Sequence, residues 1–219
     1  MADLKDLRAR WNAALRAARS DPGAPGPSPD PSQYADNLLA RWAEPQRRYH
    51  TTDHLAAVLD HIDTLEGYAD DPNLVRLAAW FHDAIYRPEL STNEDRSARL
   101  AERALPEAGL SGTATKEVAR LVRLTRTHDP EGGDRNGTVL CDADLAVLAS
   151  PPDAYAAYAA AVREEYAFVP DDLFRTGRAD VLRHLLGLPR LFHTPHGEHA
   201  WESAARRNVS AELEQLLGS

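Results

Sequence analysis

The chain is organised around one stretch, Ala78-Ala79-Trp80-Phe81-His82-Asp83-Ala84-Ile85-Tyr86. An apolar run typical of a buried helix ends here at a His-Asp pair. An imidazole and a carboxylate are costly to bury unless a partner satisfies them. A core carbonyl could satisfy His82 while Asp83 caps the helix end, or a metal ion could bind both side chains. The pair alone leaves both interpretations open.

Apolar residues recur at helical spacing on both sides of this stretch, and no segment shows the period of two that is typical of a strand. Helices are expected at 3–19, 33–43, 53–66, 72–86, 92–104, 113–128, 152–166, 171–187 and 197–217. An apolar segment at 140–148, a turn at 131–137 and a Pro-rich loop at 21–32 lie between them. The sequence therefore predicts a single all-α domain of roughly nine or ten helices, with residues 1–32 packed on a domain formed by residues 33–219.

Composition narrows the class of partner. The 219 residues include 25 basic and 34 acidic side chains, giving a formal net charge of −9, whereas nucleic-acid and anionic membrane surfaces select basic proteins. The single cysteine, Cys141, excludes an internal disulfide and a Cys-based zinc site. No signal peptide is visible, and no apolar run approaches the ~18 residues of a membrane helix. We therefore expect a soluble, cytoplasmic protein without nucleic-acid or membrane partners.

Metal-ligating residue types occur in the order His54, His82-Asp83, Asp144, separated by 28 and 61 residues. Each interval leaves room for one or more helices and a return to the same interior. Two imidazoles and two carboxylates suit Mn, Fe, Co, Ni, Zn or, more weakly, Mg. Each residue also has a simpler explanation, because His54 could be a satisfied core or capping group and Asp144 could cap a helix beside Asp142.

This order of residues on an all-α chain resembles the HD-domain superfamily of metal-dependent phosphohydrolases. Five longer sequence motifs resemble those of a bacterial branch of predicted hydrolases in that superfamily: Arg48-Tyr49-His50-Thr51-Thr52-Asp53-His54, Phe81-His82-Asp83-Ala84-Ile85-Tyr86, Asn93-Glu94-Asp95-Arg96-Ser97-Ala98, Asp142-Ala143-Asp144-Leu145 and Trp201-Glu202-Ser203-Ala204-Ala205-Arg206-Arg207-Asn208. The resemblance covers about residues 33–215.

The resemblance implies four metal ligands, which are His54, His82, Asp83 and Asp144. Asp144 is preferred to Asp142 because the final Asp of the family usually follows a small residue, as in Ala143-Asp144-Leu145. The implied activity is hydrolysis of a phosphoester of a nucleotide or another small phosphorylated metabolite by a metal-activated water. Such a reaction needs a proton acceptor, and the catalytic candidates are Asp83 and Glu94.

An acidic protein that takes an anionic substrate needs local positive charge, for which Arg48, His50 and His128 are the candidates. Tyr86 and Arg87 stand where the alarmone hydrolases carry an acidic pair, so the substrate of that branch is not implied. Dinuclear branches carry two further histidine ligands between the His-Asp pair and the last Asp, and this chain has only one histidine there, His128. A di-iron oxygenase on the same scaffold and a non-catalytic binder of a phosphorylated ligand are therefore the alternative functions.

Overall fold

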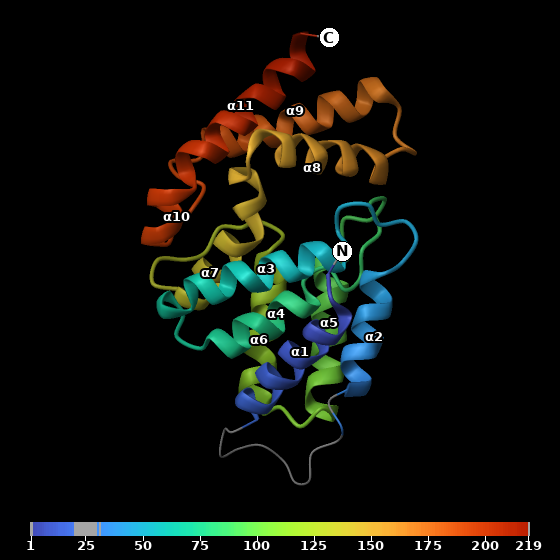
Figure 1. Cartoon of the computed structure of the whole chain (residues 1–219), viewed down its shortest axis with the longest axis vertical. Helices are drawn as coiled ribbons and strands as arrows, with labels where there is room; N and C mark the ends of the chain where they lie inside the picture. Colours follow the sequence, from blue (N-terminus) through green and yellow to red (C-terminus); the bar gives the residue numbers. More distant parts are fainter. Residues whose placement is uncertain (1, 20–29, 31, 219) are drawn as a thin grey trace.

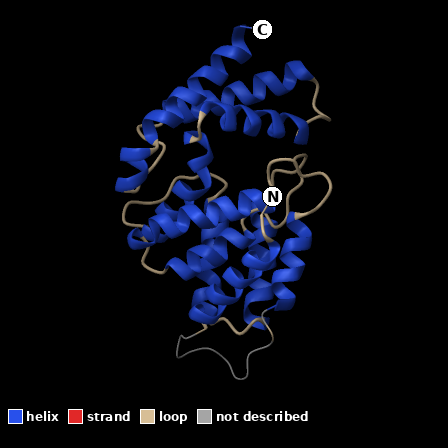
Figure 2. Cartoon of the chain, in the orientation of Figure 1, coloured by secondary structure: helices blue, strands red, loops and turns tan. Residues whose placement is uncertain are grey.

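The computed structural model describes residues 2–19, 30 and 32–218 of the chain. These residues form eleven α-helices and two short 3-10 helices and contain no strand (Figure 2). The helices are α1 Leu4–Ala18, α2 Ser32–Trp42, α3 Thr52–Leu65, α4 Pro72–Phe81, α5 Asn93–Glu107, α6 Gly112–Leu124, α7 Arg135–Leu145, α8 Pro152–Glu165, α9 Asp171–Gly187, α10 Pro195–Ala200 and α11 Glu202–Gly218. The predicted all-α fold is confirmed, and the helix count is close to the expected nine or ten.

The helices form two layers, with α1–α7 in one body and α8, α9 and α11 across one end of it (Figure 1). The larger core lies within α1–α7 and includes Trp11, whose ring contacts Trp80 at 5.3 Å and Phe81 at 6.0 Å between centroids. Helix α1 thus shares the core of the main body. The Pro-rich loop expected at 21–32 lies largely outside the described residues.

A smaller core holds the second layer together, with Leu148, Leu182 and Val209 among its buried residues. Trp201 packs against both cores and so connects the two layers. The helix expected at 197–217 is in fact two, because the chain departs from regular helix at Trp201 between α10 and α11. No helix of the described chain is long and apolar enough to cross a bilayer.

Helix α4 ends at Phe81, five residues before the predicted end at residue 86. The buried guanidinium of Arg47 holds the turn that follows, because it donates hydrogen bonds to the carbonyl oxygens of Asp83 at 2.8 Å and Ala84 at 3.5 Å. Carbonyl groups at a helix end need such partners. His82 and Asp83 therefore lie in the turn after α4 rather than within it.

Two further boundaries differ from the prediction. Helix α6 ends at Leu124 instead of residue 128, and His128 follows with a left-handed backbone at φ 51°. Helix α7 begins at Arg135, inside the expected turn, because the Asp134 side chain accepts the Gly137 N–H and acts as an N-cap. The Asp/Asn/Gly composition of this segment signals a helix start as well as a turn.

Candidate metal centre

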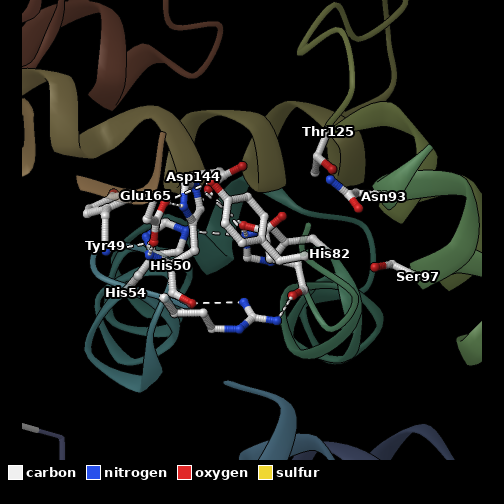
Figure 3. A network of polar contacts seen from close by, with 12 residues as sticks. Tyr49, His50, His54, His82, Asn93, Ser97, Thr125, Asp144 and Glu165 are labelled. Atoms are coloured by element: carbon white, nitrogen blue, oxygen red, sulfur yellow. Dashed lines mark hydrogen bonds and ion pairs between the residues drawn. The ribbon is translucent and has the colours of Figure 1, made fainter. Parts of the chain in front are cut away.

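Three segments bring metal-ligating side chains to one point between α3, α4 and α7. His54 lies in the first turn of α3, His82 directly after α4, and Asp144 near the end of α7. Both imidazoles are buried and the carboxylate is partly buried. Figure 3 shows the three side chains turned toward one another.

The separations between the donor atoms suit a single ion. The Nε2 atoms of His54 and His82 are 3.3 Å apart, and Oδ1 of Asp144 lies 3.1 Å and 3.5 Å from them. An ion with bonds of about 2.1 Å would separate neighbouring ligand atoms by about 3.0–3.4 Å. These three residues could therefore hold one metal ion, and two nitrogens with an oxygen suit a divalent transition metal.

The His82 ring is fixed by a second contact on its other side. Its Nδ1–H donates to the Ala79 carbonyl at 2.8 Å, so Nε2 is the nitrogen left to face the cluster. Metal-binding histidines generally have such an outer partner, which sets the tautomer and the ring orientation. The sequence left open whether His82 contacts a core carbonyl or a metal ion. In the structure Nδ1 contacts the carbonyl and Nε2 is left for a metal, so the two interpretations are compatible.

Asp83 lies at the edge of this group. Its Oδ2 is 3.2 Å from Nε2 of His82 and 3.9 Å from Nε2 of His50. The group whose ligand atoms all lie within 4.8 Å of one another consists of His54, His82 and Asp144 without Asp83. The structure therefore places Asp83 next to the three-residue group.

Electrostatic coupling within the cluster shifts its pKa values in opposite directions. Burial lowers the pKa of His54. At His82 burial also lowers the pKa, but the Asp83 and Asp144 carboxylates outweigh it and hold the pKa well above its usual value. Burial raises the pKa of both carboxyls, yet the adjacent imidazoles leave each one lowered. The cluster therefore carries two carboxylates at neutral pH, and a cation would compete with a proton for His82.

The two aspartates of α7 have different surroundings because residues two apart on a helix point about 200° apart. Asp142 is fully buried and accepts hydrogen bonds from the backbone N–H groups of His193 and Thr194 and from the Thr194 hydroxyl. Asp142 thus fixes the segment before α10, whereas Asp144 lies in the metal-ligating group.

The other predicted site residues lie at different distances from this group. His128 Nε2 is 2.9 Å from Oδ2 of Asp144, so His128 contacts the cluster from the loop after α6. His50 reaches it through Asp83. The Arg48 guanidinium donates to the carbonyls of Pro45 and Arg47. Arg48 lines a smaller cleft of about 450 Å³ that His54 and Asp144 also border, but it does not line the larger cleft beside the metal-ligating group.

That cleft has a volume of about 650 Å³. On one side it is bordered by His54, His82, Asp83, His128, Asp144 and Glu94. Helices α8 and α9 and the loop between them contribute a mostly apolar wall, with the apolar side chains Val162, Val169, Leu173, Phe174 and Val181 beside Tyr158, Tyr166 and Arg178. The cleft therefore joins a polar, metal-ligating end to an apolar wall.

The loop after the His-Asp pair is held by the start of α5. The Asn93 side chain accepts the Arg87 N–H at 3.1 Å and donates to the carbonyls of Arg87 and Leu90. The Ser97 hydroxyl accepts the Ile85 N–H at 3.0 Å. These contacts fix the helix on which Glu94 borders the cleft.

Glu165, at the end of α8, is a site residue that the sequence analysis missed. One carboxylate oxygen accepts the backbone N–H groups of Arg48, Tyr49 and His50, and the other lies 2.6 Å from Nδ1 of His50 and accepts the Tyr86 hydroxyl (Figure 3). Arg48, Tyr49 and His50 lie 115 to 117 positions from Glu165 in sequence and Tyr86 lies 79 positions away, and Glu165 belongs to no local motif. Glu165 thus connects the second layer to the turn before His54.

Glu165→Gln is expected to destabilise the fold by about 1–3 kcal/mol, because charge-assisted hydrogen bonds to a buried carboxylate are lost. Burial raises the pKa of Glu165, but its hydrogen bonds and His50 lower the pKa overall to about 2. A lowered folded-state pKa adds stability above the unfolded value, and this stability is lost as pH falls toward 2. Urea unfolding should therefore show a difference from the unmutated protein that shrinks below about pH 4.5.

Glu164→Gln is the matched control, since the Glu164 side chain is 65% exposed and only approaches Arg48 at 3.5 Å. It should change stability by less than about 0.5 kcal/mol. Equal effects of the two substitutions would contradict the role of Glu165.

Comparisons with protein-family models, with curated proteins and with solved structures find no match for the chain. Function is therefore inferred from the chemistry of the site.

Proposed function

We propose that the protein is a metal-dependent phosphohydrolase that uses one divalent ion held by His54, His82 and Asp144, with Asp83 as a fourth ligand. The observation that carries the proposal is the convergence of two imidazole nitrogens and a carboxylate oxygen at the end of a 650 Å³ cleft. A divalent ion there would supply a Lewis acid for a phosphoryl oxygen and would acidify water. The resemblance to HD-domain hydrolases supports the same chemistry.

The chain's own residues would handle the proton and the orientation of the substrate. A proton acceptor must lie within hydrogen-bond reach of the attacking water. Asp83, adjacent to the ligand group, and Glu94, in the same cleft, are the two candidates. His50 and His128 add cationic or hydrogen-bonding groups at the polar end, where a phosphate would be received.

The apolar wall extends the proposal to the rest of the substrate. Leu173 and Val181 border the cleft although their exposed fractions are 61% and 51%, so this wall is open to a ligand. Removing apolar surface from water is worth about 25 cal/mol per Å². We therefore propose a phosphoester whose phosphate lies at the metal end while an apolar or aromatic group packs against α9.

The two alternative functions make different demands on the same residues. A di-iron oxygenase needs a second set of ligands, and His128, in contact with Asp144, could supply one of them. A non-catalytic binder would use the same cleft without turnover. Two iron atoms per chain in elemental analysis would indicate the oxygenase. Turnover of a generic phosphoester would exclude the non-catalytic binder.

The test of the proposal is hydrolysis of a panel of phosphorylated compounds by protein loaded separately with Mn²⁺, Fe²⁺, Co²⁺, Ni²⁺, Zn²⁺ or Mg²⁺. Phosphate release should require the metal, stop on chelation and resume when the metal is restored. Full metal loading without phosphate release from any compound would contradict the proposed activity.

Val181→Asp is expected to raise the KM for an aryl phosphate about tenfold, because burial of roughly 60 Å² of apolar surface is lost. The kcat/KM for a small polar phosphoester should change little, since its phosphate lies at the other end of the cleft. Leu217→Asp, at another exposed apolar position that lies outside the cleft, should leave the hydrolysis of both substrates unaffected. A uniform loss on both substrates would contradict an apolar subsite at α9.

A further inference from the structure

Another cavity, of about 690 Å³, is lined by the Ile85–Arg87 segment and by none of the metal-ligating residues, although it shares Tyr86 with the cleft beside them. Five arginines from three parts of the chain line it: Arg41 of α2, Arg87 of the loop after α4, and Arg96, Arg99 and Arg103 of α5. Such a concentration of cations is unexpected in a chain of net charge −9. The cavity is thus a basic site on an acidic protein.

The two carboxylates that line this cavity are already bonded to groups outside it. Glu102 accepts a hydrogen-bonded ion pair from Arg123 at 2.8 Å, and Glu44 accepts from the Gln46 amide at 2.7 Å. Among the described residues, neither carboxylate forms an ion pair with any of the five arginines, so the lining keeps an excess of positive charge.

The arginines themselves are weakly paired. Arg99 contacts Asp95 at 3.0 Å and Arg87 approaches Glu89 at 3.8 Å, and both guanidinium groups are more than 60% exposed. Arg96 and Arg103 make no side-chain hydrogen bond or ion pair to the part of the chain that the structure describes. Because like charges four residues apart on a helix repel, Arg99 and Arg103 weaken α5 unless an anion lies between them.

We infer that this cavity binds a small anion with two or more phosphoryl groups. A guanidinium presents a planar set of donors that matches phosphate oxygens in pairs, and five of them exceed what one phosphoryl group can use. The overall negative charge disfavours a long polyanion such as a nucleic acid, which would be repelled beyond the cavity. The site is separate from the metal centre and does not depend on the proposed hydrolysis.

Tripolyphosphate is the probe, titrated calorimetrically into the metal-depleted full chain so that the metal centre cannot capture it. One saturable site is expected in the unmutated protein. Arg96→Gln and Arg103→Gln should each weaken binding at least about tenfold, the loss typical of a charge-assisted contact. Both side chains are exposed, so thermal melts should show that the fold is retained.

The matched control is Arg183→Gln on α9, which removes the same charge from an exposed arginine that pairs with Asp180 and lies outside the cavity. It should change the affinity less than twofold. Absence of saturable binding in the unmutated protein would overturn the inference, as would equal weakening by all three variants, which would indicate an effect of net charge alone. Tighter binding of an acidic peptide than of tripolyphosphate would overturn the ligand class.

Discussion

Asp144→Asn is expected to lower the affinity for the divalent ion at least about 100-fold, since loss of an outer-shell partner alone typically costs 10–100-fold. Asp144 contacts three imidazoles, with Oδ1 3.1 Å from His54 and 3.5 Å from His82 and Oδ2 2.9 Å from His128. Asparagine removes the negative charge that balances the cation. Under the proposed function, phosphate release should be lost together with the metal, because the ion would supply the Lewis acid.

Metal content after dialysis, measured by elemental analysis, checks this expectation. Asp142→Asn is the matched control, because it makes the same chemical change two residues earlier on α7 at a carboxyl that contacts His193 and Thr194. Both Asp142 oxygens accept hydrogen bonds in a fully buried position, so Asp142→Asn should cost stability, which a thermal melt of the same sample measures, while the three metal-ligating side chains stay unchanged. Metal retained in the Asp144 variant but lost in the Asp142 variant would refute the assignment of the ligand.

The helical fold could be predicted because its signals are local. Apolar periodicity located most helices to within a few residues, and capping residues such as Asp71 before α4 are visible in the sequence. The turn that replaces the end of the predicted helix could not be predicted, since it is held by Arg47, which lies 36 positions before Asp83 and donates to the Asp83 carbonyl. A turn held by a tertiary contact leaves no periodic signal.

The metal-ligating group was predictable in composition but not in surroundings. His54, His82 and Asp144 belong to recognisable sequence motifs, and the structure brings their ligand atoms together. Glu165 could not be found in this way, because its role comes from three backbone N–H groups more than a hundred residues away. The contacts of Arg48 could not be predicted either. Its position in sequence beside the first histidines did not reveal that its guanidinium donates to the nearby carbonyls of Pro45 and Arg47.

Glu94→Gln is expected to lower the rate of phosphoester hydrolysis about 10²–10⁴-fold, the usual contribution of one general acid or base. Glu94 is partly buried in the first turn of α5 and borders the cleft that contains the metal-ligating group. The amide keeps the shape of the side chain but cannot accept a proton. The rate should be measured at saturating metal, with the metal content and the thermal melt determined on the same sample.

Asp95→Asn is the control that separates catalysis from helix stability. Asp95 occupies the same first turn but pairs with Arg99 and Arg123 outside the cleft. Each carboxylate is stabilised by the positive end of the helix dipole, so both Glu94→Gln and Asp95→Asn should lower the free energy of unfolding by about 0.3–1 kcal/mol. If Glu94→Gln lowers the melting temperature as Asp95→Asn does and leaves the rate unchanged, Glu94 is structural. The proton acceptor would then have to be sought at Asp83, which lies next to the ligand group, or among the waters around the ion.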